Sequence, residues 1–482
     1  MLTISRNDIG ARLRADNPWW TGRLDLNVPP FSLDKRDYFA PLERLVIGNV
    51  ARAIVLLGAR RVGKTTLLRQ LIGNLFRSRH FPAILFVSID TPTYAGMSLA
   101  HFLEFFEKEC PHDPQQLRLA VFDEIQYLPD WERHLKDLVD RYPNTKFIVS
   151  GSAGAALKRK SAESGAGRFT DFELPSLTFA EFIRFRGMEQ NLISLEQWKS
   201  GVHAFNARDI DKLNREFVDY INFGGYPEAL FSPEIQRNFP QFVGRDIVDK
   251  VLLRDLPSLY GIQDIQELNR LFAVLSYNTG QEISLEALAQ NSGVAKNTIQ
   301  RYLDYLEAAF LIYRVRRVDD SARRFQRQRN FKVYLANPSM RAALFGPVDE
   351  NHQAFGSLAE TATLCQWIHS PEVRNLHYSR WADGEVDFVR LDPASARVSW
   401  AYDVKWSDHH VTSDEDIRSL LSFATKCKLT VVGASTRSVS KKRTARNIEI
   451  RLFPLSLHCY AIGKLNAMER VAMLESFLKI FD

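Results

Sequence analysis

The sequence contains few cysteines and no long uninterrupted apolar segment. Its four cysteines are scattered and form no C-x-x-C pair, so neither a zinc site nor a disulfide framework is indicated. No stretch approaches the length of about 18 apolar residues that a membrane-spanning helix needs, and the N-terminus has no apolar leader-like region. We therefore expect a cytoplasmic protein with no membrane partner.

A strong charge of either sign is also missing. The 482 residues include 63 Lys and Arg against 57 Asp and Glu, a net charge of +6, which favours nucleic acid or another acidic partner only weakly. The hydrophobic content of 45% is ordinary for a globular protein. A chain of this length has room for about three domains of ~150 residues each.

The chain contains the nucleoside-triphosphate pattern G-x-x-x-x-G-K-[ST] at residues 58–65. An apolar run at 53–57 precedes it as a buried strand, and a stretch with helical spacing, 66–72, follows it. The loop N–H groups and the start of that helix would face the phosphates of ATP, Lys64 would add positive charge, and the Thr65 hydroxyl would bind Mg²⁺. The residues predicted to surround the nucleotide are Gly58, Ala59, Arg60, Arg61, Val62, Gly63, Lys64, Thr65 and Thr66. Within this set we expect Arg60 and Arg61 to brace the loop.

A second apolar run, 119–122, ends in two carboxylates. Asp123 would bind Mg²⁺ and Glu124 would polarise the attacking water. The apolar run 83–89 lies between the two motifs, so the acids follow a third strand, an arrangement of the ATP-hydrolysing branch of P-loop proteins. A fourth run, 146–149, leads to Ser152, which would contact the γ-phosphate or the water; a cap or turn serine fits equally well.

The pattern of breaks predicts five segments. The P-loop core is an α/β ATPase domain with a parallel sheet, preceded by a Trp-rich and Pro-rich arm that packs on it. We expect an arm at 1–40, the core at 41–185, a helical lid at 186–270, a winged helix at 271–335 and a C-terminal α/β domain at 336–482.

The predicted winged helix has a helix-turn-helix pattern around Gly293, with Ser284 capping its first helix. Its second helix would turn polar residues toward a nucleic-acid groove, and a basic hairpin after it would hold DNA phosphates. The groove candidates are Lys296, Asn297, Gln300 and Arg301. The hairpin candidates are Arg314, Arg316, Arg317, Arg323, Arg324, Arg327, Arg329 and Lys332. The alternative is a packing module whose charges are merely solvated.

Acidic residues and a lysine in the C-terminal part resemble the PD-(D/E)xK restriction-endonuclease-like superfamily. Asp387 lies within a predicted strand, and Asp403 and Lys405 lie on one face of the next. In that chemistry Asp387 and Asp403 hold Mg²⁺ with Glu360 of a preceding helix, and Lys405 positions or deprotonates the lytic water.

The whole chain resembles prokaryotic AAA-type ATPases (AAA_14-like) with a C-terminal DUF4143 domain. The residues that carry the resemblance are Asn17-Pro18-Trp19-Trp20, the loop 58–66, Val121 to Gln126, Pro129-Asp130-Trp131, Ser150-Gly151-Ser152, Gly167-Arg168, Leu174-Pro175, Phe179, Glu181-Phe182, Gly224 to Pro227, Gly384 to Phe388, and Asp403-Val404-Lys405. The resemblance implies an AAA-like core, a winged helix and a nuclease-like domain. Many members carry E-x-K where this chain has Asp403-Val404-Lys405, which shortens the reach of the acid by one methylene.

Two functions remain open at the level of sequence. In the first, an ATPase uses its nucleotide state to control a DNA-directed activity. In the second, an ATP-dependent signalling or assembly switch binds protein partners and its nuclease-like site is inactive. In either case Arg168 is a candidate to touch the γ-phosphate in its own subunit or in a neighbour of a homo-oligomer, with a salt bridge as the alternative.

Overall fold

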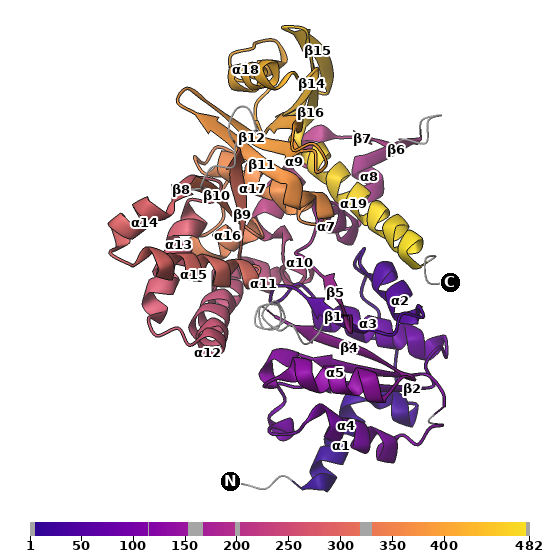
Figure 1. Cartoon of the computed structure of the whole chain (residues 1–482). Helices are drawn as coiled ribbons and strands as arrows, with labels where there is room; N and C mark the ends of the chain where they lie inside the picture. Colours follow the sequence, from indigo (N-terminus) through magenta and orange to yellow (C-terminus); the bar gives the residue numbers. More distant parts are fainter. Residues whose placement is uncertain (1–4, 114, 153–166, 198–202, 319–329, 479–482) are drawn as a thin grey trace. The chain divides into compact units, whose positions relative to one another are not determined.

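The computed structural model describes residues 5–113, 115–152, 167–197, 203–318 and 330–478 (Figure 1). The chain divides into two compact units. One is Met1–Pro175 with Glu469–Asp482, and the other is Ser176–Met468.

The first unit is built on a five-stranded sheet in the order β2-β3-β4-β1-β5. Every strand pair is parallel, so the carboxyl ends of all five strands share one edge. Strands β1 and β3 are buried along their whole length, as expected of apolar runs in a parallel sheet. The strands are β1 (Ala53–Leu57), β2 (Ala83–Ser88), β3 (Arg118–Asp123), β4 (Thr145–Gly151) and β5 (Phe169–Glu173).

Helices α2 (Phe39–Ile47) and α3 (Lys64–Arg77) pack together, and their apolar faces share a core with β1, β2 and β3. Helix α4 (Leu99–Glu109) packs against α1 (Arg6–Asp16) and α5 (Trp131–Arg141).

The N-terminal arm covers the free edge of β2. The side chain of Asn17 donates to the Phe86 carbonyl oxygen at 2.9 Å and accepts from the Phe86 amide at 2.6 Å, as a neighbouring strand would. The indole nitrogens of Trp19 and Trp20 donate to the Ile84 carbonyl oxygen at 2.8 and 2.7 Å. Burial of this Trp pair on the core agrees with the expectation that the arm packs there.

The second unit contains a nine-stranded mixed sheet in the order β15-β16-β14-β13-β12-β11-β9-β10-β8. Its strands are β8 (Glu282–Ser284), β9 (Ile312–Val318), β10 (Asn330–Leu335), β11 (Leu376–Trp381), β12 (Gly384–Leu391), β13 (Val398–Asp403), β14 (Val431–Thr436), β15 (Lys441–Ala445) and β16 (Ile448–Pro454). A separate antiparallel pair is formed by β6 (Ile193–Gln197) and β7 (His203–Ala207).

Helices of the second unit surround these strands (Figure 1). Ser284 caps α14 by accepting from the Ala287 amide at 3.0 Å. The helices and helical turns are α7 (Phe179–Phe185), α8 (Glu189–Leu192), α9 (Ile210–Asp219), η5 (Tyr220–Gly224), α10 (Pro227–Phe231), α11 (Pro233–Arg237), η6 (Pro240–Gly244), η7 (Asp246–Asp255), α12 (Leu256–Tyr260), α13 (Ile265–Tyr277), α14 (Leu285–Ser292), α15 (Lys296–Ala308), α16 (Ser339–Phe345), α17 (Phe355–Trp367), α18 (Arg418–Cys427) and α19 (Leu455–Leu478), which belongs to this unit as far as Met468.

Three features differ from the sequence expectations. Strand β5 was not predicted, because its alternating residues do not form an apolar run. The segment expected to be a helical lid also contains the strands β6 and β7. The predicted boundary at 335/336 is crossed by backbone pairing, since β9 pairs with β10 on one side and with β11 on the other.

Candidate functional site

The P-loop follows β1 and leads directly into α3. Gly63 has φ 94°, which a residue with a side chain rarely adopts, and a Cβ added to Gly58 would lie 2.3 Å from the Leu174 carbonyl oxygen. Both glycines of the pattern are therefore required by the backbone itself. Arg36 of the arm donates to the Val62 carbonyl oxygen at 3.0 Å and so braces the loop from outside.

Lys64 is buried and its ammonium folds back onto the loop. Its Nζ donates to the carbonyl oxygens of Gly58 and Ala59, both at 2.9 Å. Thr65 and Thr66 follow in the first turn of α3, where the helix dipole favours an anion. The loop thus concentrates positive charge at the edge of the sheet where β1 ends.

Asp123 accepts hydrogen bonds from groups on three sides. The Thr65 hydroxyl donates to its Oδ2 at 2.6 Å, the Glu124 amide donates to its Oδ1 at 3.2 Å, and the Ser150 hydroxyl also donates to Oδ1. Asp123 is 1% exposed. These donors fix the carboxylate beside the Thr65 hydroxyl, as a shared Mg²⁺ site requires.

Glu124 stands next to this acid in a strained conformation. Its φ of 56° lies in the left-handed region, which is costly for a residue with a side chain. The side-chain nitrogen of Gln126 donates to the Glu124 carboxylate, and the side-chain oxygen Oε1 of Gln126 accepts from the Ser152 backbone amide at 3.3 Å. Burial raises the pKa of Glu124 above its usual value, while the nearby charges of Lys64 and Arg60 oppose the shift.

Ser152 lies at the end of β4, and its hydroxyl oxygen is buried without a hydrogen-bond partner among the described residues. A buried hydroxyl without a hydrogen-bond partner destabilises the folded protein unless a ligand or a water molecule forms a hydrogen bond with it. The residues of β1, β3 and β4 that were singled out in the sequence therefore meet at one edge, because these strands are neighbours and parallel.

Arg168 lies where the strands of this sheet begin, at the end opposite to the P-loop. Its carbonyl oxygen accepts from the amide of Ala53, the first residue of β1, whereas the P-loop follows the last residue. Its side chain forms an ion pair with Asp140 at 3.1 Å. The suggestion that Arg168 touches the γ-phosphate of its own chain does not fit this position. A role toward a neighbouring subunit remains a prediction.

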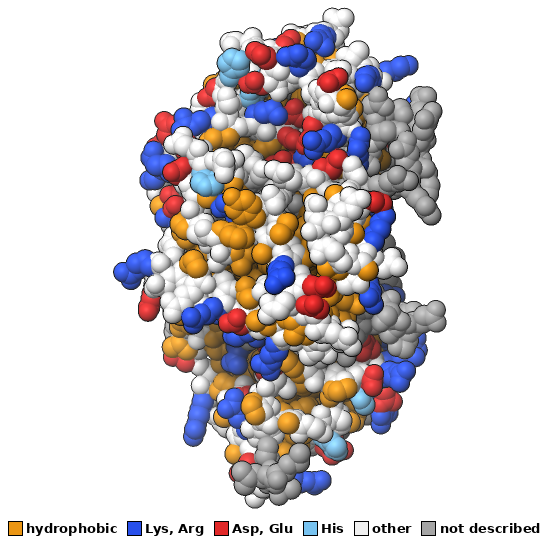
Figure 2. All heavy atoms as spheres, turned by 90° about the vertical axis from the view of Figure 1, so that its left-hand side faces the viewer, with side chains coloured by type: hydrophobic (Ala, Val, Ile, Leu, Met, Phe, Trp, Pro, Cys, Tyr) orange, Lys and Arg blue, Asp and Glu red, His pale blue; other side chains and the backbone are white. Residues whose placement is uncertain are grey.

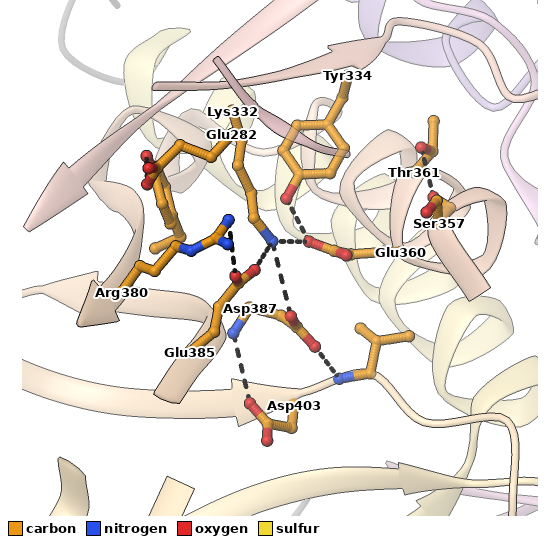
Figure 3. A network of polar contacts seen from close by, with 12 residues as sticks. Glu282, Lys332, Tyr334, Ser357, Glu360, Thr361, Arg380, Glu385, Asp387 and Asp403 are labelled. Carbon is orange, nitrogen blue, oxygen red and sulfur yellow. Dashed lines mark hydrogen bonds and ion pairs between the residues drawn. The ribbon is translucent and has the colours of Figure 1, made fainter. Parts of the chain in front are cut away.

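The residues of the predicted nuclease-like site also come together, with one unexpected addition. Figure 3 shows the three acids Glu360, Asp387 and Asp403 with this addition. The Asp387 amide donates to Asp403 Oδ1 at 3.4 Å, and Lys405 Nζ lies 3.5 Å from Asp403 Oδ2 and 4.0 Å from Asp387 Oδ2. Strand β13 ends at Asp403, so Lys405 follows the strand instead of lying within it. The addition is Lys332, whose Nζ is 2.7 Å from Glu360 Oε1 and 3.7 Å from Asp387 Oδ1.

The electrostatics of this cluster follow from its burial. Burial raises the pKa of Glu360 to about 7 and that of Asp403 to about 6. The charge of Asp403 in turn raises the pKa of Lys405 above its usual value. Lys332 forms a further ion pair with Glu385, and the Tyr334 hydroxyl donates to Glu360.

A divalent metal does not fit this cluster as predicted. The Lys332 ammonium lies among the carboxylates that were expected to ligate the ion. Among the described residues, no group of three or more His, Cys, Asp or Glu side chains is arranged to hold a metal ion. The prediction that Glu360, Asp387 and Asp403 share Mg²⁺ is therefore not supported.

The basic residues of the predicted wing have different surroundings. Lys332 is 2% exposed and cannot hold DNA phosphates, which corrects its predicted role. Arg314 forms ion pairs with Asp304 and Glu307. Arg316 is exposed, and Arg317 lies 3.8 Å from Glu282. The remaining hairpin candidates, Arg323, Arg324, Arg327 and Arg329, lie outside the described residues.

The candidates for a groove lie on α15. Lys296, Asn297 and Arg301 are exposed, although Lys296 forms an ion pair with Glu286. Gln300 is half-buried and donates to Asp304 at 3.0 Å.

Comparisons with known families agree with the geometry of the first unit. Residues 50–183 match the AAA domain family (AAA_14), so the chain contains an AAA-type ATPase domain. Residues 214–351 match a domain of unknown function (DUF8612). The DUF4143 domain that the resemblance implied for residues 336–482 is not shown, and the match to DUF8612 covers residues 214–351.

Three relatives among curated proteins are each described as an uncharacterized protein. A protein of Haemophilus influenzae is 24% identical over 62% of this chain and 70% of its own length. Two proteins of Methanocaldococcus jannaschii are 25% and 23% identical and are matched over 55% and 59% of their lengths. This chain therefore spans little more than half of the archaeal relatives.

The solved structures that match this chain include the Orc1 protein of Aeropyrum pernix in complex with DNA and Cdc6p of Pyrobaculum aerophilum. The first has 15% identity and a TM-score of 0.29 and covers 66% of this chain and 95% of the other. The second has 13% identity and a TM-score of 0.28 and covers 67% and 96%. TM-scores this low indicate nothing about the function of this chain.

Three residues of the two sites make contacts that the sequence interpretation did not predict. Gln126 and Ser150 belong to motifs that the sequence interpretation recognised. Their hydrogen bonds were not predicted, because they join the residues at the ends of the neighbouring strands β3 and β4. Lys332 had no local signal, because it belongs to a basic run and its acidic partners lie 28 to 55 positions further along the chain.

Proposed function

We propose that this protein binds ATP with Mg²⁺ at the P-loop edge of its first unit and hydrolyses it, and that its nucleotide state controls a DNA-directed activity of residues 271–335. The observation that carries the ATPase proposal is the convergence of Thr65, Asp123 and Glu124 at the end of β1 and β3. Two acids and a hydroxyl at that place serve the chemistry of phosphoryl transfer.

Each residue has a task that its position supports. The loop amides and Lys64 would bind the phosphates, and Lys64 would exchange its two carbonyl partners for phosphate oxygens. Thr65 and Asp123 would hold Mg²⁺, which supplies charge neutralisation between the phosphates. Glu124 would orient the water and accept its proton.

The ATPase proposal is tested with Lys64→Ala and Glu124→Gln. We expect Lys64→Ala to weaken ATP binding, and Glu124→Gln to retain binding while the hydrolysis rate falls by about 100-fold, within the usual range for a general base. Lys108→Ala and Glu104→Gln change exposed residues of α4 and serve as matched controls. Hydrolysis at the wild-type rate in both site variants would sink the proposal.

Support for the DNA-directed part comes from the order of elements between α13 and β10. Helices α13, α14 and α15 with the strands β8, β9 and β10 follow the order of a winged helix, in which the α15 position enters a groove. The face seen in Figure 2 has no large, purely basic surface, because acidic and basic side chains are interspersed on it. A modest, salt-sensitive affinity is therefore expected.

Charge reversal tests this part. Arg301→Glu, and separately the pair Arg323→Glu and Arg324→Glu, should each weaken binding of duplex DNA at low salt and reduce its salt dependence. Arg237→Glu, on α11 outside the predicted winged helix, is the control. Equal DNA affinity in all variants, or no affinity in the wild type, would reject DNA as the target.

A second candidate function is a nucleotide-dependent switch that binds a protein partner and cleaves nothing. The position of Lys332 within the nuclease-like cluster favours this candidate over a nuclease. Incubation with DNA or RNA and Mn²⁺ should then give no cleavage. Cleavage that disappears in Asp387→Ala and Lys405→Ala would reject it.

A further inference from the structure

We propose that Lys332 is a tethered cation that takes the place of a divalent metal ion in the C-terminal acid cluster, so that this cluster joins three structural elements instead of binding metal. The inference concerns the second unit alone and is independent of the ATPase proposal.

The geometry places one nitrogen among carboxylates from two other elements. Lys332 comes from β10, Glu360 from α17, and Glu385 and Asp387 from β12. The Lys332 ammonium contacts Glu360 at 2.7 Å and Asp387 at 3.7 Å and also pairs with Glu385. Figure 3 shows these side chains converging on that nitrogen.

The ammonium and a metal ion exclude one another. A divalent ion bound by carboxylate oxygens lies about 2.0 to 2.6 Å from them. An ion at that distance from Glu360 and Asp387 would stand against the buried ammonium, and two cations in contact repel strongly where the dielectric is low. Lys332 cannot withdraw with its strand, because β10 is paired with β8 through Glu282 and with β9 through Val315.

The charge balance agrees with this substitution. Four carboxylates, Glu360, Glu385, Asp387 and Asp403, face three cations: Lys332, Lys405, and Arg380, which lies 3.4 Å from Glu385. When all four acids are ionised, as a bound cation would require, the cluster without Lys332 carries an excess of two negative charges, the charge that one divalent ion balances. Removal of the side chain should therefore create a metal site where the wild type has none.

The test compares Mn²⁺ binding by the full-length wild type and by Lys332→Ala, without nucleotide, using isothermal titration calorimetry. We expect Lys332→Ala to gain one site that binds at least 10-fold more tightly than any site of the wild type. The gain should disappear in Lys332→Ala combined with Asp387→Asn. Weak Mn²⁺ binding at the P-loop does not affect the comparison, because the wild type and all variants share that site.

Lys296→Ala, which also removes a lysine from an ion pair in the same segment, is the matched control and should gain no site. A folded Lys332→Ala that gains no site would overturn the proposal. So would wild-type Mn²⁺ binding that Asp387→Asn abolishes. If Lys332→Ala does not fold, a crystal of the wild type soaked in Mn²⁺ decides: an anomalous peak between Glu360 and Asp387 overturns the proposal, and its absence with Lys332 in place supports it.

Discussion

At the scale of single residues, Glu124 depends on its neighbour Gln126. The Gln126 amide donates to the Glu124 carboxylate and links it to the Ser152 amide at the end of β4. We expect Gln126→Ala to lower the rate of ATP hydrolysis by about 10-fold with little change in ATP affinity, because a mispositioned base is a poorer base. Steady-state kinetics measure both quantities.

Gln70→Ala is the matched control for this change. Gln70 is also a buried glutamine of the first unit, but its amide donates to the carbonyl oxygens of Pro30 and Leu33, away from the acids. Gln70→Ala should change the stability of the first unit without a specific loss in the rate of ATP hydrolysis. A Gln126→Ala protein that hydrolyses ATP at the wild-type rate would show that Glu124 needs no such support.

A second residue-scale prediction concerns His458 of α19. Its ring stacks on Tyr402 with centroids 4.6 Å apart, and burial lowers its pKa to about 4. Below pH ~6.5 the unfolded chain binds a proton that the folded chain does not, so stability falls as pH drops from about 6.5 toward 4. We expect a loss of about 1 to 2 kcal/mol between about pH 7 and pH 5 from this residue.

Urea unfolding of the second unit at the two pH values measures the effect. Between the two pH values, the free energy of unfolding should fall by about 1 to 2 kcal/mol less in His458→Gln than in the wild type. His101→Gln, on the exposed surface of α4, should behave as the wild type. Identical pH dependence in wild type and His458→Gln would contradict the prediction.

At the scale of elements, the arm acts as a substitute strand for the edge of β2. Asn17→Ala would leave the amide and carbonyl of Phe86 buried without their partner. We expect a loss of about 2 to 4 kcal/mol in the free energy of unfolding of the first unit, since each unsatisfied buried group costs about 1 to 3 kcal/mol. Asn27→Ala, at an exposed position of the same arm, should change it by less than about 0.5 kcal/mol. A similar effect of both substitutions in urea titrations would refute the role of Asn17.

The same scale shows what sequence can and cannot predict. The P-loop strand, β3 with its two acids and α17 follow from apolar runs and helical spacing, because these signals are local. Strand β5 alternates between polar and apolar residues, so it gave no such run. The site around Asp123 was predictable because parallel strands end at one edge, whereas Lys332 reaches its acids only through the pairing of β10 and the packing of α17.

At the scale of the whole molecule, the predicted boundary at 335/336 would divide a continuous sheet. A fragment of residues 336–482 would lose the pairing of β11 with β9 and the ion pairs of Lys332. We expect this fragment to show no cooperative thermal transition by circular dichroism, and a fragment of residues 176–468, which keeps the whole sheet, to melt cooperatively. A cooperative melt of the shorter fragment would show that the C-terminal part folds independently.

Among the described residues, no helix is both long and apolar enough to span a bilayer. The nine-stranded sheet raises a different problem of association, since an open sheet has two edges that could recruit strands from other copies. One edge, β8, is only three residues long. The other, β15, carries the exposed side chains of Lys441 and Lys442, so two copies meeting there would repel each other. This protection against edge-to-edge aggregation should weaken as salt screens the two lysine charges.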